Sequence, residues 1–432
     1  MIKNKLVQNI LIYGGVTGLS RMLPILLLPF YLSVLSIEEF GRIEVLVALY
    51  NLIIIFGSMQ LETAVQRYMY KVENKANYTL ALSIVVFILS TLAFFVVAIS
   101  SKEISHLLFG SDIEYVNIII ISICSVLFNV STILLIYFRY AEQEKLFSLI
   151  TLSQVVVTAV VTYALVVVEP LGNLGYVLGM SSGWVTVVIS SALLIYYKNK
   201  SIRPDFSIIR QSVDFSWPQL PARFGSFFVQ FGNRFIALSY FGAQTVAILG
   251  LATKFAAFFQ LIYIAFNMAW NPYLYKNEHD ENLENKINKT LRIVLALIVF
   301  SSLIIHVLGG WVIDVFFDAE YSEVKNIIIL AILPSGLLIF KEILETGIKL
   351  SGKTKYISYS YFISVVFTIG FMFLANDLHG LLIASLLGSI ILILCSWYYS
   401  EKTYQLRYSK STLFSLLGFV VIVLYLVFIK YL

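Results

Sequence analysis

The stretch NIIIISI at Asn117–Ile123 recurs as NIIILAI at Asn326–Ile332, 209 residues later in the chain. Each such match alone is weak, because apolar segments resemble one another. Two further pairs have nearly the same spacing, namely LSIEEFGRIE (Leu35–Glu44) with FGAQTVAILG (Phe241–Gly250), and LGYVLG (Leu174–Gly179) with HGLLIA (His379–Ala384). Three matches in the same order at nearly one offset predict two homologous halves.

The composition indicates an integral membrane protein. Hydrophobic residues make up 59% of the 432 residues and charged residues 13%, and the mean hydropathy is +0.87. One soluble core cannot hide that much apolar surface. A helix needs about 20 apolar residues to cross a bilayer. We predict an all-α protein with spans near Asn9–Ser33, Ile43–Gln66, Thr79–Ala98, Val116–Phe138, Phe147–Val168, Leu174–Tyr196, Val213–Tyr240, Val246–Trp270, Thr290–Phe316, Asn326–Ile348, Tyr356–Ala375, Leu381–Tyr399 and Leu413–Phe428.

These spans predict two homologous six-helix bundles and one additional C-terminal helix. Residues 1–200 form the predicted N-terminal bundle and residues 212–403 the C-terminal bundle, with the polar, basic segment 201–211 as the loop between them. Residues 404–432 contain the additional transmembrane helix. The first apolar run is longer than the roughly 7–15 residues of a signal-peptide core, and no small-x-small cleavage site follows it. We therefore interpret it as the first span.

The charges predict how the spans are oriented. Basic residues cluster in alternate loops, and acidic residues such as Glu38, Asp112 and Glu320 gather in the others. By the positive-inside rule, the N-terminus and every basic loop are cytoplasmic. The repeated turns at 35–44 and 241–250 then both lie outside, so the bundles are related by an axis along the membrane normal. Such repeats place a substrate cavity between the bundles. The net charge of +5 reflects this orientation, and we expect no binding to nucleic acid.

The sequence carries no motif for nucleotide or metal chemistry. It has no Walker loop and no nucleotide-binding glycine motif, and its four histidines lack the spacing of metal ligands. Cys124 and Cys395 both lie inside predicted spans, so they form no disulfide framework. We expect no cofactor and no ATP hydrolysis.

Cations inside the spans predict the binding site. A charge at the bilayer centre costs about 2.5–3.5 kcal/mol, so it normally faces a cavity or a partner. Such a cavity would attract an anion, and a phosphate-type group suits Arg and Lys especially well. Five of the 30 Lys and Arg residues lie within predicted spans: Arg21, Arg223, Arg234, Lys254 and Lys341.

Three of these cations have a structural alternative. Arg21 could form an interhelical salt bridge or bind carbonyls freed by Pro24. Arg234 lies about two turns from the outer face and could snorkel towards water. Lys341 reaches Glu345 at i,i+4, an arrangement typical of an exposed helix surface.

Prolines occur in equivalent spans of the two halves. Pro24 and Pro29 lie in the first span, and Pro218 and Pro221 in the seventh. A proline removes a helix hydrogen bond and permits a kink. We predict that these four residues interrupt their helices and act as hinges near the binding site. The alternative is a static kink held by packing.

Short motifs carry a family resemblance over nearly the whole chain. They are LSIEEFGRIEVL after the first span, QLETAVQRY (Gln60–Tyr68), WPQLPARF and GNRFIALSYFGAQTVAILGLATKF (within Trp217–Phe255), NPYLYK (Asn271–Lys276), SGKTKY (Ser351–Tyr356) and NDLHGLLIASLLGS (Asn376–Ser389). Through them the sequence resembles the bacterial polysaccharide-transport family. That family includes the O-antigen flippases and belongs to the multidrug/oligosaccharidyl-lipid/polysaccharide exporter superfamily.

The resemblance implies a V-shaped pair of bundles that alternates between inward-open and outward-open states. The implied activity is transport and not enzymatic: an oligosaccharide linked to undecaprenyl diphosphate moves from the inner to the outer leaflet of the bacterial cytoplasmic membrane. The relatives' cationic cavity matches Arg21 and Lys254 here, with Arg223 as a further candidate. Arg234 lies in the family's Asp-Arg-Phe pattern, but Asn233 replaces the acid.

The resemblance also implies candidate coupling sites and partners. Ion-coupled relatives use intramembrane carboxylates, which makes Glu62, Glu342 and Glu345 candidates for coupling to an H+ or Na+ gradient. Glu62 could instead pair with Arg67. The expected partners are membrane lipid, the lipid-linked oligosaccharide and a polysaccharide polymerase or chain-length machinery, and the expected state is a monomer.

Two other functions remain open. A cation-coupled multidrug antiporter of the same superfamily would need an acidic cavity, and the excess of span Arg and Lys argues against it. A membrane glycan polymerase or ligase would need a large outer loop with catalytic residues, whereas every predicted outer loop here is short.

Overall fold

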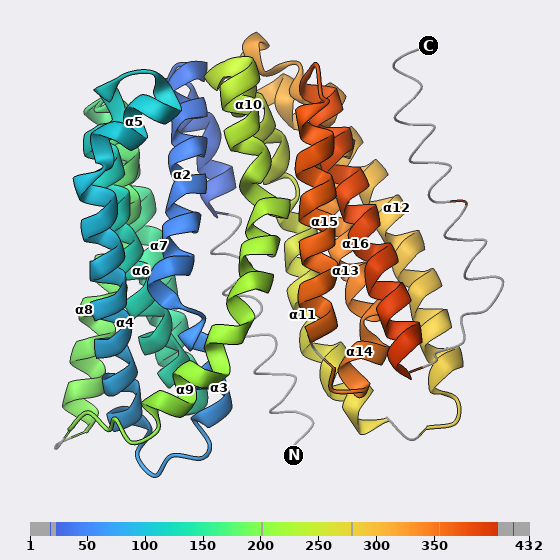
Figure 1. The fold of residues 1–432 in the computed structure, drawn as a ribbon. Coiled ribbons are helices and arrows are strands. Elements are labelled where there is room, and N and C mark those ends of the chain that lie inside the picture. Colours follow the sequence, from blue (N-terminus) through green and yellow to red (C-terminus); the bar gives the residue numbers. More distant parts are fainter. Residues whose placement is uncertain are drawn as a thin grey trace. The chain divides into compact units, whose positions relative to one another are not determined.

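The computed structural model describes Gly18, residues 23–199, 202–277, 280–353 and 355–404, and Gly418. Throughout these residues the regular structure is helical (Figure 1). Ten helical segments of this part are long and apolar enough to cross a membrane. The chain is therefore a multi-pass membrane protein, as predicted. Apart from Gly418, the predicted last span lies outside the described residues.

The chain divides into two compact units. The first comprises the described residues up to Phe227 together with Leu238–Ala247, and the second comprises Phe228–Ala237 together with the described residues from Ile248 onward. Helix α10 (Leu220–Lys254) contributes to both. The first unit also contains α2 (Ile37–Ser58), α3 (Leu61–Tyr68), α4 (Lys75–Ile99), α5 (Ser101–Phe109), α6 (Tyr115–Tyr140), α7 (Glu144–Tyr163), α8 (Gly172–Lys198) and α9 (Ile209–Ser216). The second contains α11 (Ala257–Lys276), α12 (Leu283–Phe316), α13 (Val324–Leu344), α14 (Thr346–Leu350), α15 (Lys355–Phe373) and α16 (Leu378–Tyr404).

The two units repeat the same helix packing. In the first unit α6 packs on α4 and α8, and α7 packs on α8. In the second unit α13 packs on α12 and α16, and α15 packs on α16 (Figure 1). Helices α6 and α13 begin 209 residues apart (324 − 115), and α8 and α16 begin 206 residues apart (378 − 172) with 27 residues each. The repeated motifs thus lie on equivalent helices, which confirms the duplicated pattern.

Local signals start the helices that follow the repeated turns. Ser36 and Glu39 form a capping box before α2: the Glu39 amide donates to Ser36 Oγ at 3.2 Å, and the Ser36 amide donates to Glu39 Oε2 at 2.9 Å. At the equivalent place Gly242 bends α10 with φ 80° and ψ 175°, a conformation open to glycine. The two turns also touch, because a Cβ on Gly41 would lie 1.8 Å from the Ala243 carbonyl oxygen.

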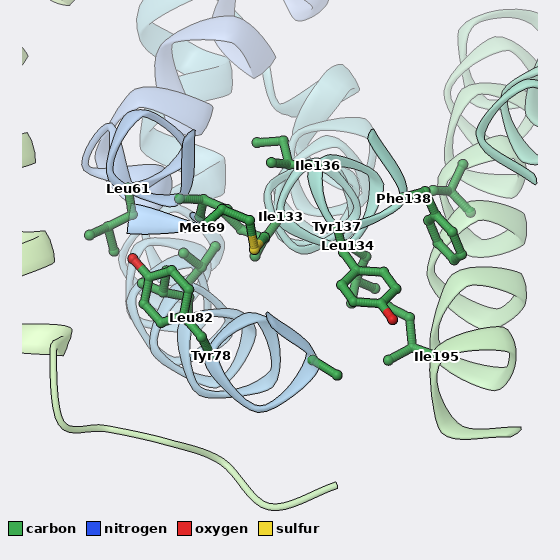
Figure 2. Close-up of a cluster of buried hydrophobic side chains, with 14 of the residues drawn as sticks. Leu61, Met69, Tyr78, Leu82, Ile133, Leu134, Ile136, Tyr137, Phe138 and Ile195 are labelled. Atoms are coloured by element: carbon green, nitrogen blue, oxygen red, sulfur yellow. The ribbon is translucent and has the colours of Figure 1, made fainter. Parts of the chain in front are cut away.

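The segment between the two halves is attached to the first unit. The Tyr78 hydroxyl lies 2.8 Å from Ser212 Oγ of α9, and the Asp205 amide donates to the Asn77 carbonyl at 3.1 Å. The boundary between the units therefore falls within α10, after the predicted inter-bundle loop. Tyr78 also belongs to a buried cluster of side chains from α3, α4, α6 and α8 (Figure 2) that includes Leu61, Leu82, Ile133, Phe138 and Ile195.

Two expectations about the spans are wrong, and one loop contains an additional helix. The predicted eighth span is broken, since α10 ends at Lys254 and α11 begins at Ala257. The loop after the third span contains α5, a short helix that buries only one side. Pro29 lies inside an uninterrupted helix, Leu23–Leu32, because one proline removes only its own amide bond to the preceding turn. A hydropathy profile measures the length of an apolar run, so it does not detect a helix break, a short helix in a loop or a proline that a helix accommodates.

Candidate functional site

The predicted cation Arg234 bonds to Thr253, the residue before the predicted cation Lys254, near the break in the eighth span. Arg234 precedes the Gly242 bend of α10, and Lys254 ends the helix after it. Arg234 Nη2 donates to Thr253 Oγ1 at 2.9 Å, next to Lys254 in the chain. Lys254 is half-buried at the C-terminal end of α10, where the helix dipole favours a cation.

Arg234 is anchored inside the second unit. Its residue is 4% exposed, Nη1 donates to the Gln230 carbonyl at 3.3 Å, and the guanidinium lies 5.1 Å from the centre of the Phe231 ring. The alternative that Arg234 snorkels is therefore wrong, because its side chain bonds inward. Thr253 supplies a partner in this chain, where Asn233 replaces the acid of the family pattern.

Arg223 takes no part in the contact between Arg234 and Thr253. Arg223 is exposed in the first turn of α10 and belongs to the first unit. Its charge acts on Glu62 in the first turn of α3. The guanidinium of Arg67, the other partner considered for Glu62, lies 4.2 Å from the centre of the Phe215 ring. Arg21 lies outside the described residues.

The candidate coupling residues Glu342 and Glu345 lie in a buried charge cluster, defined as Lys341, Glu342, Glu345 and Lys349. Lys341 Nζ lies 2.5 Å from Glu345 Oε1, and Lys349 Nζ contacts Glu342 Oε1. The four side chains are between 2% and 13% exposed. The predicted i,i+4 pair is therefore present, but the reading of Lys341 as a helix-surface residue is wrong.

Tyrosines from two neighbouring helices complete the surroundings of this cluster. The Tyr263 hydroxyl of α11 donates to Glu342 Oε2 at 3.2 Å, and Lys341 Nζ donates to the Tyr361 hydroxyl of α15 at 3.3 Å. Buried charges need such hydrogen bonds as well as counter-ions, because water is excluded. The formal charges of the cluster cancel, and with its tyrosines it joins the four helices α11, α13, α14 and α15.

The prolines of the seventh span lie at an interruption, as predicted. Pro218 lies in a 3-10 turn, Trp217–Gln219, between α9 and α10, and Pro221 is the second residue of α10. Proline is suited to a first helical turn, where its missing amide is not needed. Pro24 is exposed near the start of the described helix Leu23–Leu32. Hinge motion at these residues stays a prediction.

A buried acid in the first unit, Glu114, was not predicted from the sequence. Glu114 is 2% exposed, and its carboxylate accepts from Asn117 Nδ2 at 2.6 Å and from Asn173 Nδ2 at 2.7 Å. Arg42 Nη1 lies 3.8 Å away. Asn117 is the first residue of the repeated NIIIISI motif, so this motif was the signal that could have pointed to Glu114.

The side chains of these sites act on a ligand through their charges. Among the described residues, no group of three or more His, Cys, Asp or Glu side chains could hold a metal ion. Arg234 and Lys254 place two cations within the membrane-embedded second unit. Such a pair can attract an anionic group of a ligand, as Arg and Lys do for phosphates.

Solved structures of transporters share this fold. A multidrug resistance transporter of the MATE family, inward-facing and of the MOP superfamily, has a TM-score of 0.70 at 13% identity, covering 90% of this chain and 94% of its own. The lipid II flippase MurJ has a TM-score of 0.66 at 15% identity, and the match covers 95% of this chain and 91% of that of MurJ. A mutant of the Vibrio cholerae MATE transporter VcmN has a TM-score of 0.65 at 15% identity, and the match covers 94% of this chain and 97% of that of VcmN. At these identities the likeness shows the fold alone.

The sequence itself matches one family over more than half of its length. No curated protein matches the chain. The family described as "Polysaccharide biosynthesis protein" matches residues 6–278 of the 432, a range that includes α10 with Arg234 and Lys254. The chain therefore belongs to the polysaccharide biosynthesis protein family.

Proposed function

We propose that the chain is a flippase for an oligosaccharide linked to undecaprenyl diphosphate, such as an O-antigen repeat unit. It moves this lipid from the inner to the outer leaflet of the bacterial cytoplasmic membrane by alternating access. The observation that carries the proposal is the pair of cations, Arg234 and Lys254, at the broken eighth span. Membership of the polysaccharide family and the fold shared with the lipid II flippase support it.

The cations would act on the diphosphate. An anionic head group pays a large electrostatic cost in an apolar layer, and fixed positive charges lower that cost. Arg234 is held by Thr253, whereas Lys254 is half-buried at a helix end. We therefore assign direct contact with the diphosphate to Lys254 and a supporting position to Arg234, with Arg21 and Arg223 as further proposed contributors. A few dispersed cations bind reversibly, as transport requires, and no bond in the substrate changes.

Energy coupling is a separate part of the proposal. Glu62, Glu342 and Glu345 are the proposed sites for H+ or Na+, with the N-terminus on the cytoplasmic side. Because Glu342 and Glu345 each contact a lysine, an ion that binds there must displace or replace that contact. A proton gradient and a sodium gradient, imposed separately across proteoliposomes, distinguish the two ions by which one changes the rate of lipid movement.

The decisive experiment follows a fluorescent polyprenyl-diphosphate oligosaccharide between the leaflets of proteoliposomes. We expect the wild type to speed this movement over empty liposomes. The Lys254→Gln variant should lose about tenfold or more of the rate, because a lost charged contact to phosphate is worth more than about 1.4 kcal/mol. Lys325→Gln is the matched control, since Lys325 pairs with Asp314 at 2.5 Å outside this site. Its rate should equal that of the wild type.

Two results would overturn the proposal. If Lys254→Gln moves the lipid as fast as Lys325→Gln does, the cation at the broken span is not part of the site. If folded wild-type protein moves no lipid under either ion gradient, the chain has another substrate. Uptake of an organic cation in the same liposomes would then point to the multidrug antiporter.

A further inference from the structure

The first unit contains a cavity that the proposed cationic site does not use. It has a volume of about 260 Å³ and lies between the helix Leu23–Leu32 and helices α2, α6, α7 and α8. The residues described along its wall all belong to the first unit, and none of them carries a charge. The cavity therefore suits a neutral ligand.

One wall of the cavity is a polar face of α7. Gln154, Thr158 and Thr162 are spaced four residues apart, so they lie on one side of the helix. Gln154 Nε2 donates to Thr158 Oγ1 at 3.4 Å. Asn51 of α2 adds a second amide, whose Nδ2 donates to the Val47 carbonyl at 2.8 Å. Amides and hydroxyls both donate and accept hydrogen bonds.

Aromatic rings form much of the remaining wall. Phe128 packs edge-to-face against Tyr50 and Trp184, with ring centroids 5.9 and 4.8 Å away, and Tyr31 packs in the same way against Tyr176 at 6.3 Å. These contacts hold the rings in place. The Tyr50 residue is buried, and its hydroxyl lies beside the polar groups of Cys124 and Trp184.

We propose that this cavity binds one neutral sugar ring of the transported glycan. That the ring belongs to the glycan rests on the proposed flippase function. A pyranose has hydroxyl groups around its edge and apolar C–H faces, so it matches a wall of amides and hydroxyls beside aromatic rings. The volume lies below the roughly 300–1,000 Å³ of sites for drug-sized ligands, which suits a single ring.

Other parts of the substrate fit the cavity less well. A polyprenyl chain would leave the amide of Gln154 without a new partner, which opposes binding. A diphosphate would find no cation among the described lining residues. A cavity that holds only water is the remaining competitor, and the experiment below separates it from the sugar.

The test uses the full chain in lipid nanodiscs prepared without glycosidic detergent. The probes are the methyl pyranosides of glucose, galactose, mannose and N-acetylglucosamine, each observed by saturation-transfer NMR. We expect saturable transfer to at least one glycoside. An excess of undecaprenyl phosphate should not displace it, because the lipid binds elsewhere.

Matched variants of α7 locate the binding. Ala159→Phe fills the cavity and should abolish the transfer, whereas Val160→Phe changes a neighbouring residue that is 61% exposed and should have no effect. Gln154→Leu keeps the size of the side chain but removes its amide, and should weaken binding about tenfold. Thr158→Val should also weaken it, while Thr151→Val, whose hydroxyl bonds its own helix at the Phe147 carbonyl, should not.

The outcomes separate this inference from the proposed function. If the wild type moves the lipid-linked glycan but no glycoside shows saturable transfer, the cavity holds only water and the inference falls while the flippase stands. Displacement of the glycoside by undecaprenyl phosphate would assign the cavity to the lipid and overturn the inference as well. If glycosides bind as expected but no lipid moves, the site for a sugar remains and the flippase proposal fails.

Discussion

At the scale of single residues, the buried charge cluster predicts a large effect from a small change. Glu345→Gln would leave Lys341, whose side chain is 4% exposed, without its counter-ion at 2.5 Å. An uncompensated charge in such a place is strongly unfavourable. We expect the free energy of unfolding to fall by about 3–5 kcal/mol, measured by thermal unfolding of the purified protein.

Two comparisons show whether the pair, and not glutamine itself, causes that loss. The double variant Lys341→Met/Glu345→Leu removes both charges and should recover most of the stability. Lys286→Gln breaks an exposed pair, with Lys286 Nζ 2.5 Å from Asp280 Oδ2, and should change the stability little because water solvates both groups. A Glu345→Gln protein as stable as the wild type would contradict the buried pairing.

The sequence predicted part of this cluster. The spacing of Lys341 and Glu345 was enough to predict their contact, because i,i+4 side chains share a helix face. Their burial was not predictable from α13 alone. It depends on Tyr263 of α11 and Tyr361 of α15, which approach from distant parts of the chain.

At the scale of elements, the close approach of the two repeated turns predicts a steric effect. A Cβ on Gly41 of α2 would lie 1.8 Å from the carbonyl oxygen of Ala243 in α10, so one backbone must move. We expect Gly41→Ala to lower the free energy of unfolding by about 1–3 kcal/mol. Thermal unfolding of the purified variant measures this loss.

Gly370→Ala is the control for the same substitution. Gly370 lies within α15, and no heavy atom lies within 4 Å of the position of its Cβ. Alanine is the better helix former, so this variant should gain roughly 0.5–1 kcal/mol. Equal effects at the two glycines would show that the helices do not meet at Gly41.

The sequence predicts a helix well where the length of an apolar run sets its ends. It predicts the ends less well where a local contact sets them. The repeated motifs correctly indicated equivalent helices, since α8 and α16 both have 27 residues. The break after Lys254 was missed, because the run through it is apolar on both sides. A local contact lies beside this break: the Thr253 hydroxyl donates to the Gly250 carbonyl at 2.8 Å and also accepts from Arg234.

At the scale of the whole molecule, the charge pattern predicts the orientation in the membrane. With Cys124 and Cys395 replaced by alanine, single cysteines report which side each loop faces. Ser111→Cys and Glu320→Cys are exposed, equivalent positions in predicted outer loops. Both should react with a membrane-impermeant maleimide in intact cells.

Two inner positions complete the orientation experiment. Glu73→Cys and Glu281→Cys are likewise exposed and nearly equivalent, and should react only after the membrane is permeabilised. Labelling of Ser111→Cys and Glu320→Cys from opposite sides would make the repeat inverted and not parallel. Labelling of all four positions in the reverse pattern would place the N-terminus outside.

The sequence alone determined the membrane class, the positions of most spans and the duplication, because apolar length and repetition are properties of the chain itself. It also repeats the same acid and amide in both halves, Glu114 with Asn117 and Glu323 with Asn326. Only the tertiary structure separates their roles. Asn173 of α8 and Arg42 of α2 reach Glu114, which is buried, whereas Glu323 and Asn326 are exposed.

The physical reason lies in the neighbouring helices. In the repeat that pairs Leu174 with His379, Leu378 takes the place of Asn173, and in the repeat that pairs Leu35 with Phe241, Ile248 takes the place of Arg42. A carboxylate stays buried only where donors from other elements meet it, and those donors come from helices distant in the chain. For the same reason, the amides, hydroxyls and rings around the 260 Å³ cavity, which come from four helices and the segment Leu23–Leu32, became a single site only when the first unit folded.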